Sequence, residues 1–170
     1  MRKNVRRLTR CAVLTALALA ISVCEGLFPL AVLVPLPGLR LGLANLVTIY
    51  ALVCLSPRES FAILVSRCFL GALVGGNLSA LAFSLTGGIL AFGVMWGLLH
   101  VPGLSLFGVC IAGAAGHNAG QVLAAMGVLG SPAIAVYLAP LLLASVVTGA
   151  VTGAASILLV RRVPQLETNS

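Results

Sequence analysis

The chain has 170 residues, of which 61% are hydrophobic and 8% are charged. Its mean hydropathy of +1.18 is far above that of a water-soluble domain. Apolar stretches long enough to cross a bilayer recur along its whole length, which excludes a soluble protein and predicts an all-α, polytopic membrane helix bundle. Residues 1–170 are expected to form a single domain. The net charge of +7 does not indicate nucleic-acid binding, because the basic residues stand at the ends of apolar runs.

Six membrane-spanning segments are expected, separated by turn-forming sequences that contain glycine, proline or serine. A basic N-terminus of residues 1–8 precedes them, and a tail of residues 163–170 follows. Pro140 is expected to kink the last segment. The predicted segments cover residues 9–28, 39–55, 60–76, 78–99, 104–129 and 132–160.

The distribution of basic residues predicts the orientation in the membrane. With six spans, the N-terminus, the loop after the second span and the tail share one side, which then carries Arg2, Lys3, Arg6, Arg7, Arg10, Arg58, Arg161 and Arg162. The other side carries only Arg40. The positive-inside rule therefore predicts a cell-membrane protein with both termini in the cytoplasm. A cleaved signal peptide at the N-terminus is disfavoured, because its removal would leave five spans and spoil this asymmetry.

A few polar side chains interrupt the apolar runs, where an unpaired amide, imidazole or charge costs several kcal/mol. Most of them fall between the midplane and the expected outer face, and the three in "GHNAGQ" lie on one helix face at about 100° per residue. One interpretation is a substrate-binding cavity open to the outside, formed by Glu25, Arg40, Asn45, Asn77, His117, Asn118 and Gln121. The alternative is a hydrogen-bond network that only holds the helices together. For Arg67, both snorkelling toward the cytoplasm and pairing with Glu25 remain open.

The first span presents a stripe of small residues, Ala12, Ala16 and Ala20, opposite Glu25 on the helix. Such a smooth face suits docking against a partner helix, although alanine is common in membrane helices. Four pairs of glycines with four-residue spacing predict close helix packing: Gly71/Gly75, Gly93/Gly97, Gly116/Gly120 and Gly149/Gly153.

No enzyme signature is present. The chain has no G-x-x-x-x-G-K-[ST] sequence, and it contains no aspartate, so it lacks the aspartate-rich motif that binds magnesium diphosphate. His117 has no second histidine or acid at metal-ligand spacing, and the five cysteines are scattered. We therefore expect a protein without enzyme activity, metal or cofactor.

The blocks "PLPGLRLGLANLVTIYAL", "RCFLGALVGGN", "SLTGGILAF" and "AGAAGHNAGQ" resemble the Gx transporter family, which is also called heptaprenyl diphosphate synthase component I. That family is similar to the S components of energy-coupling factor transporters, which are six-helix membrane proteins with an outward-facing substrate site. The resemblance implies a substrate-binding subunit of a small-molecule or vitamin importer. It also implies that Ala12, Ala16 and Ala20 dock on an energy-coupling transmembrane subunit and its ATPases, and that residues 29–40 form a loop over the site.

The family's second name supports an alternative function, a non-catalytic membrane component of heptaprenyl diphosphate or isoprenoid quinone synthesis. Without acids to bind magnesium, the chain is not expected to be the catalytic half of a synthase. A third hypothesis is a structural subunit of a larger membrane complex, in which the polar residues only hold helices together.

Overall fold

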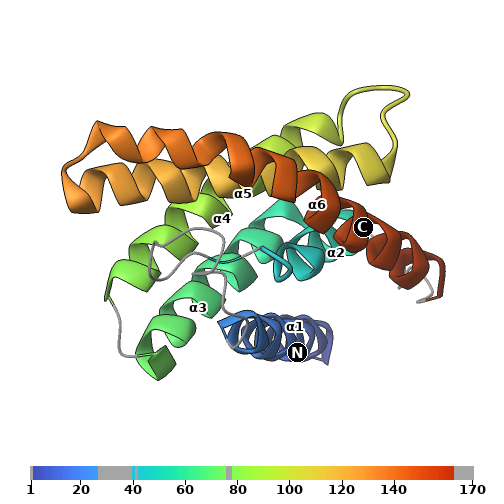
Figure 1. Ribbon diagram of the computed structural model, residues 1–170. Coiled ribbons are helices and arrows are strands. Elements are labelled where there is room, and N and C mark those ends of the chain that lie inside the picture. The colour runs from blue at the N-terminus through green and yellow to red at the C-terminus, as the bar shows by residue number, and fades with distance from the viewer. Residues whose placement is uncertain (1, 27–39, 41, 76–77, 163–170) are drawn as a thin grey trace.

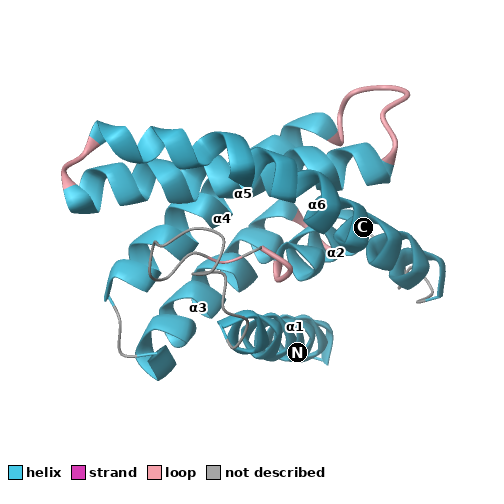
Figure 2. Ribbon diagram, in the orientation of Figure 1, coloured by secondary structure: helices cyan, strands magenta, loops and turns pink. Residues whose placement is uncertain are grey.

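The computed structural model describes residues 2–26, 40, 42–75 and 78–162, and all regular structure in these residues is helical (Figures 1 and 2). The elements are α1 (Arg2–Gly26), α2 (Asn45–Cys54), α3 (Pro57–Gly75), α4 (Leu78–Leu98), α5 (Leu106–Leu129), the 3-10 helix η2 (Pro132–Tyr137) and α6 (Leu138–Arg162). The all-α prediction is therefore confirmed for the part of the chain that is described.

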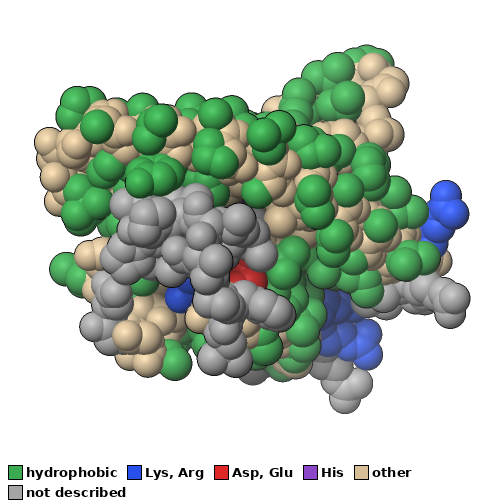
Figure 3. All heavy atoms as spheres, viewed as in Figure 1, with side chains coloured by type: hydrophobic (Ala, Val, Ile, Leu, Met, Phe, Trp, Pro, Cys, Tyr) green, Lys and Arg blue, Asp and Glu red, His purple; other side chains and the backbone are tan. Residues whose placement is uncertain are grey.

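Three stretches are long and apolar enough to cross a membrane: Asn4–Gly26, Leu78–Leu98 and Pro132–Arg161. Large hydrophobic side chains also lie exposed along these helices, and Figure 3 shows hydrophobic side chains spread widely over the visible surface. Both observations identify a membrane protein. The helices α3 and α5 are also long, but buried polar residues interrupt their apolar sequences. The number of six membrane crossings stays a prediction.

The second predicted span is shorter than expected, because α2 begins at Asn45 rather than near residue 39. Gly42 has φ of 81°, a left-handed conformation that prevents α2 from extending toward the N-terminus through this residue. At about 1.5 Å per residue, α2 is about 15 Å long, which is half the thickness of the hydrocarbon core. Its side chains Val47, Thr48 and Ile49 are buried in the protein, where a short helix at membrane depth is tolerated.

The ends of the other helices follow local sequence signals. Ser105 accepts a hydrogen bond from the Gly108 backbone N–H at 3.1 Å and starts α5, and Gly130 ends that helix with φ of 62°. Pro140 lies in the first turn of α6, just after the 3-10 helix. A proline there removes an N–H that has no partner within α6, and the kink expected at this residue stays a prediction.

The helices form two groups. The helix α5 packs between α4 and α6, and α1 packs on α3 (Figure 1). The two groups meet where α3 packs on α4, and α2 contacts helices of both groups. Three apolar clusters fill the interior; they are represented by Phe83 and Val122, by Ile49 and Met95, and by Ala18 and Ile63. The site described below lies where α1, α2, α3, α4 and α5 meet.

Two of the four glycine pairs make the close helix contacts predicted for them. A Cβ atom at Gly120 would lie 2.7 Å from the Gly87 Cα atom, and one at Gly149 would lie 2.5 Å from the Ile111 Cα atom. Their partners Gly116 and Gly153 also face neighbouring helices closely. In contrast, a Cβ atom at Gly75, Gly93 or Gly97 would meet nothing within 4 Å. Close packing thus holds α5 against α4 and α6, and the other two pairs do not contribute to it.

The basic ends of α1 and α3 lie together. Arg7 Nε donates a hydrogen bond to Glu59 Oε1 at 2.8 Å, and this ion pair joins the two helices. Leu159, near the end of α6, lines a groove together with Leu14 of α1. Figure 3 accordingly shows most of the visible Lys and Arg side chains toward one edge of the molecule. This arrangement fits the charge asymmetry on which the predicted orientation rests.

Glu59 also begins α3 through a capping box, an S-x-x-E signal that the sequence analysis did not use. Its Oε2 atom accepts hydrogen bonds from the Ser56 backbone N–H and hydroxyl at 3.0 and 2.7 Å. Burial alone would raise the pKa of Glu59, but the hydrogen bonds from Ser56 and Arg7 outweigh burial and hold the pKa below its usual value of 4.5. Charged Glu59 therefore stabilises the folded state above that value, and its contribution is lost as the pH falls through the folded-state pKa.

We expect Glu59→Gln to lower the free energy of unfolding at pH 7 by about 1 kcal/mol or less, because Arg7 is largely exposed. The melting temperatures of the variant and the original protein in detergent should differ at pH 7 and converge at pH 3. A difference that stays constant over this range would show that the carboxylate charge is not the cause.

Candidate functional site

The residues Arg40 and 42–45, from the "RLGLAN" block, connect most of the predicted polar side chains. The left-handed Gly42 turns the chain, and backbone hydrogen bonds from Asn45 N to Gly42 O and from Leu46 N to Leu43 O then start α2. A Cβ atom at Gly42 would lie 2.7 Å from His117 Cδ2 and 3.0 Å from Asn45 Nδ2. Glycine is therefore required here both for the backbone conformation and for the approach of the His117 ring.

Gln121 of α5 binds the backbone of Arg40 with both ends of its amide. Gln121 Oε1 accepts a hydrogen bond from the Arg40 N–H at 2.8 Å, and Gln121 Nε2 donates one to the Arg40 carbonyl at 2.7 Å. The Gln121 side chain is only 1% exposed, and these two bonds give both its oxygen and its nitrogen a partner. Gln121 therefore holds the start of the turn against α5.

Glu25, near the end of α1, binds the same turn from the other side. Its Oε1 atom accepts a hydrogen bond from the Leu43 backbone N–H at 2.6 Å. A carboxylate in this position also faces the positive end of the α2 dipole. The burial of Glu25 thus has a structural explanation, since the acid attaches α1 to the beginning of α2.

Arg67 of α3 neither snorkels to the surface nor ion-pairs with Glu25. Its guanidinium donates hydrogen bonds to Ser22 Oγ at 3.3 Å and to Asn45 Oδ1 at 3.4 Å, and the side chain is 4% exposed. Among the described residues, no carboxylate oxygen lies within 4 Å of it. Within the described part of the chain, Arg67 is therefore a buried cation with only long hydrogen bonds to neutral partners.

His117 is buried between the turn and α4. A Cβ atom at Gly87 would lie 2.9 Å from His117 Nδ1, so the ring touches the backbone of α4 on one side and Gly42 on the other. Among the described residues, neither ring nitrogen makes a hydrogen bond of good geometry, although the ring interacts with the Gly87 backbone. Asn45 Nδ2 and Arg67 Nε likewise make no hydrogen bond to a described residue. Asn45, Arg67 and His117 thus form a contiguous buried group with four unpaired nitrogen atoms.

The structure divides the seven residues predicted to form one cavity. Five of them, Glu25, Arg40, Asn45, His117 and Gln121, surround the turn described above. Asn118 instead faces α6, where its Nδ2 atom donates a hydrogen bond to the Leu141 carbonyl at 2.7 Å. Asn77 and the predicted loop, apart from its last residue Arg40, lie outside the described residues.

Three further features were missed or left open at the sequence level. Arg67 was kept apart from the predicted cavity, although it bonds to Asn45. Ser22, which binds Arg67, was not singled out; its position three residues before Glu25 on the same helix face is a usable signal. Gly42 and Gly87 line the His117 ring, and only their place in the "RLGLAN" and "SLTGG" blocks marks them in the sequence.

The alanine stripe of α1 lies on the outer surface of the molecule. Ala12, Ala16 and Ala20 are exposed, and Glu25 is buried. The helix therefore has the two-faced arrangement that the sequence predicts, although the structure contains no partner to test docking.

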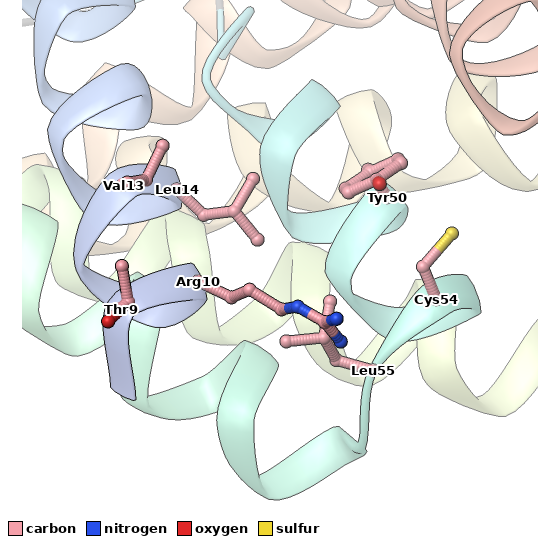
Figure 4. Close-up of a pocket in the computed structure, with 7 residues that line it drawn as sticks. All are labelled: Thr9, Arg10, Val13, Leu14, Tyr50, Cys54 and Leu55. Atoms are coloured by element: carbon pink, nitrogen blue, oxygen red, sulfur yellow. The ribbon is translucent and has the colours of Figure 1, made fainter. Parts of the chain in front are cut away.

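Two grooves lie at the opposite end of α1 from the polar group. The first has a volume of about 240 Å³ and is lined by Thr9, Arg10, Val13, Leu14, Tyr50, Cys54 and Leu55 (Figure 4). Figure 4 shows Arg10 extending from α1 toward Leu55 at the end of α2. The second, of about 200 Å³, shares Leu14 and Tyr50 with the first and continues to Leu17, Leu46, Val47 and Leu159. Neither groove includes a residue of the predicted cavity.

A comparison with protein-family models matches residues 14–159 to the family described as heptaprenyl diphosphate synthase component I. No curated protein and no solved structure matches the chain. The family match covers most of the chain and confirms the resemblance found in the sequence blocks.

Proposed function

The chain belongs to the heptaprenyl diphosphate synthase component I family, and we propose that it is a membrane-embedded solute-binding subunit of a small-molecule importer. The observation that carries this proposal is the group of Asn45, Arg67 and His117, with four unpaired nitrogen atoms in the interior of an apolar bundle. Unpaired polar groups in such surroundings are costly, and in membrane proteins they commonly mark substrate paths. Residues that only held helices together would pair these atoms, as Gln121 pairs both ends of its amide with the Arg40 backbone.

The short second helix and the turn before it also support solute binding. In many membrane transporters, substrates bind where a transmembrane segment is broken and its short helix begins. Here the turn at Gly42 precedes the ten-residue α2, and the three unpaired side chains surround this turn.

In this proposal, import needs energy-coupling partners, a transmembrane subunit and ATPases. The chain itself has no nucleotide-binding loop. The exposed face formed by Ala12, Ala16 and Ala20 is where such a partner helix would pack, because small residues allow close helix contact in lipid. The positive-inside rule places this helix's basic N-terminus in the cytoplasm, where the ATPases would act.

The chain's two histidines provide a matched test. The protein, His117→Ala and His100→Ala would be purified in mild detergent, and extracted small molecules would be identified by mass spectrometry. His100 is exposed two residues beyond the end of α4, and its ring bonds to the Trp96 carbonyl, so His100→Ala should keep the solute. A solute absent from the original protein, or kept undiminished by a folded His117→Ala variant, would contradict the proposal.

A second candidate function is a non-catalytic membrane component of prenyl diphosphate synthesis. The family description names such a synthase component, and the two joined grooves offer a long apolar surface that begins beside a cation, Arg10. A prenyl chain with an anionic head matches that combination. Deletion of the gene should then shorten or abolish the isoprenoid side chain of the quinone pool, with recovery by the original gene but not by an Arg10→Gln copy. An unchanged quinone profile in the deletion strain would remove this candidate.

A further inference from the structure

We infer that the solute of the polar site carries an anionic oxygen group, a carboxylate or a phosphate, which is bound by Arg67 and Arg40. The inference rests on the proposed function and adds the chemical class of the ligand. It depends on the charge balance of the site, on the position of the two guanidinium groups and on the kind of hydrogen-bonding atoms left unpaired.

The charge balance of the site is positive. Arginine keeps its proton in proteins, so Arg67 and Arg40 contribute two positive charges. Glu25 is the only acid among the described residues around the turn, and its carboxyl group already binds the Leu43 N–H. Whether Glu25 is ionised or protonated, at least one positive charge is left without a balancing negative charge. An uncompensated buried cation is expensive in a membrane bundle, and an anionic ligand would neutralise it.

The two guanidinium groups lie along the same stretch of α3. A Cβ atom at Gly71 would lie 3.9 Å from Arg40 Nη1, and Gly71 is one helical turn beyond Arg67. The position of Arg40 is fixed independently of its side chain, because Gln121 binds its backbone. Arg67, which belongs to α3, and Arg40, whose guanidinium lies beside Gly71 of the same helix, can together bind one oxyanion group.

The unpaired atoms are mostly donors. Arg67 Nε and Asn45 Nδ2 can act only as hydrogen-bond donors. In a neutral imidazole, one of the two His117 ring nitrogens is also a donor. A ligand that satisfies them must offer several acceptors in one place, which a carboxylate or phosphate does. The existing bonds of Arg67, at 3.3 and 3.4 Å to neutral oxygens, are long enough that a charged acceptor would be preferred.

The test compares anions with uncharged molecules of the same shape. The purified protein in uncharged maltoside detergent would be melted with acetate or acetamide, benzoate or benzamide, and inorganic phosphate or trimethyl phosphate. The anions should raise the melting temperature by several degrees at about ten times Kd, and their neutral partners should not. A further series replaces the soluble anions with phosphatidylglycerol. A rise in melting temperature with this lipid would indicate that the site binds a lipid headgroup, and no rise would indicate a free anion.

Substitutions connect the effect to these arginines. Arg67→Gln should weaken anion binding about tenfold or more, and Arg40→Gln should weaken it to a smaller extent. Arg58→Gln is the matched control, because it removes the same charge from an exposed position at the other end of α3. If Arg67→Gln does not fold, Arg67→Lys and Arg40→Gln carry the test.

Equal shifts with anions and amides, no shift with any anion, or equal weakening by Arg58→Gln would overturn the inference. The proposed function would survive any of these results if a neutral solute copurified with the protein and was lost from His117→Ala. It would fail separately if no solute copurified at all.

Discussion

Gly120→Ala is expected to lower the free energy of unfolding by about 2–3 kcal/mol or to prevent accumulation of the folded protein. The added methyl group would lie 2.7 Å from both the Gly87 Cα atom and the Thr86 carbonyl oxygen, and 2.9 Å from the Gly87 nitrogen. All three are backbone atoms of α4, so no side-chain rotation relieves the contact. The helices must separate, and the contact of the His117 ring with Gly87 is disturbed with them.

Gly93→Ala and Gly127→Ala are the matched controls for this substitution. Each lies in a helix, and a Cβ atom at either would meet nothing within 4 Å. Their unfolding free energy should stay unchanged or rise by up to about 1 kcal/mol, because alanine restricts the unfolded chain and favours helix. Thermal melting followed by size-exclusion chromatography in detergent would measure all three variants. A Gly120→Ala protein as stable as Gly93→Ala would show that α4 and α5 are not held at this distance.

Composition and periodicity predict the membrane helices well because lipid leaves few alternatives. A backbone in hydrocarbon must satisfy its hydrogen bonds within a helix, so five of the six helices lie close to the predicted segments. The exception, α2, depends on the single left-handed residue Gly42. Its sequence neighbours are apolar, and apolarity does not distinguish a full span from a short helix buried in protein.

Burial could be predicted from the sequence, but the partners of the buried side chains could not. All five of the polar residues Glu25, Asn45, His117, Asn118 and Gln121 are buried as expected. Only the fold shows that Asn118 is directed to α6 while Gln121 reaches Arg40, since 81 positions separate the latter two in the chain. At about 100° per residue, these two side chains lie about 60° apart around α5 and therefore face different neighbours.

These partners also separate the two interpretations that the sequence left open. Gln121, Asn118 and Glu25 bind backbone groups and therefore hold elements together, as a structural network would. Asn45 and His117 keep unpaired nitrogen atoms and remain the stronger candidates for ligand contact. The proposed binding site and a structural network thus adjoin each other at the turn, so substitutions there must be assessed for stability and binding separately.

Gln121→Met is the substitution in the structural network with the largest expected effect. Methionine is similar in length and unbranched, so it fills the same space, but it can form neither hydrogen bond to the Arg40 backbone. It leaves the Arg40 N–H and carbonyl without the partners they now have, at a cost of about 1–2 kcal/mol for each bond. We expect the free energy of unfolding to fall by about 2–4 kcal/mol.

The same variant should also change the local behaviour of the chain. Hydrogen exchange measured by mass spectrometry should become faster in peptides that contain Arg40, because its amide loses its acceptor. Thr86→Val is a suitable control: it removes a side-chain bond to Ala82 that lies within one exposed helix turn, so it should change stability by less than about 0.5 kcal/mol. If Gln121→Met leaves both the melting temperature and the exchange at Arg40 unchanged, the turn is held by Glu25 and the packing around Gly42 alone. The two amide bonds would then be a consequence of the fold and not one of its causes.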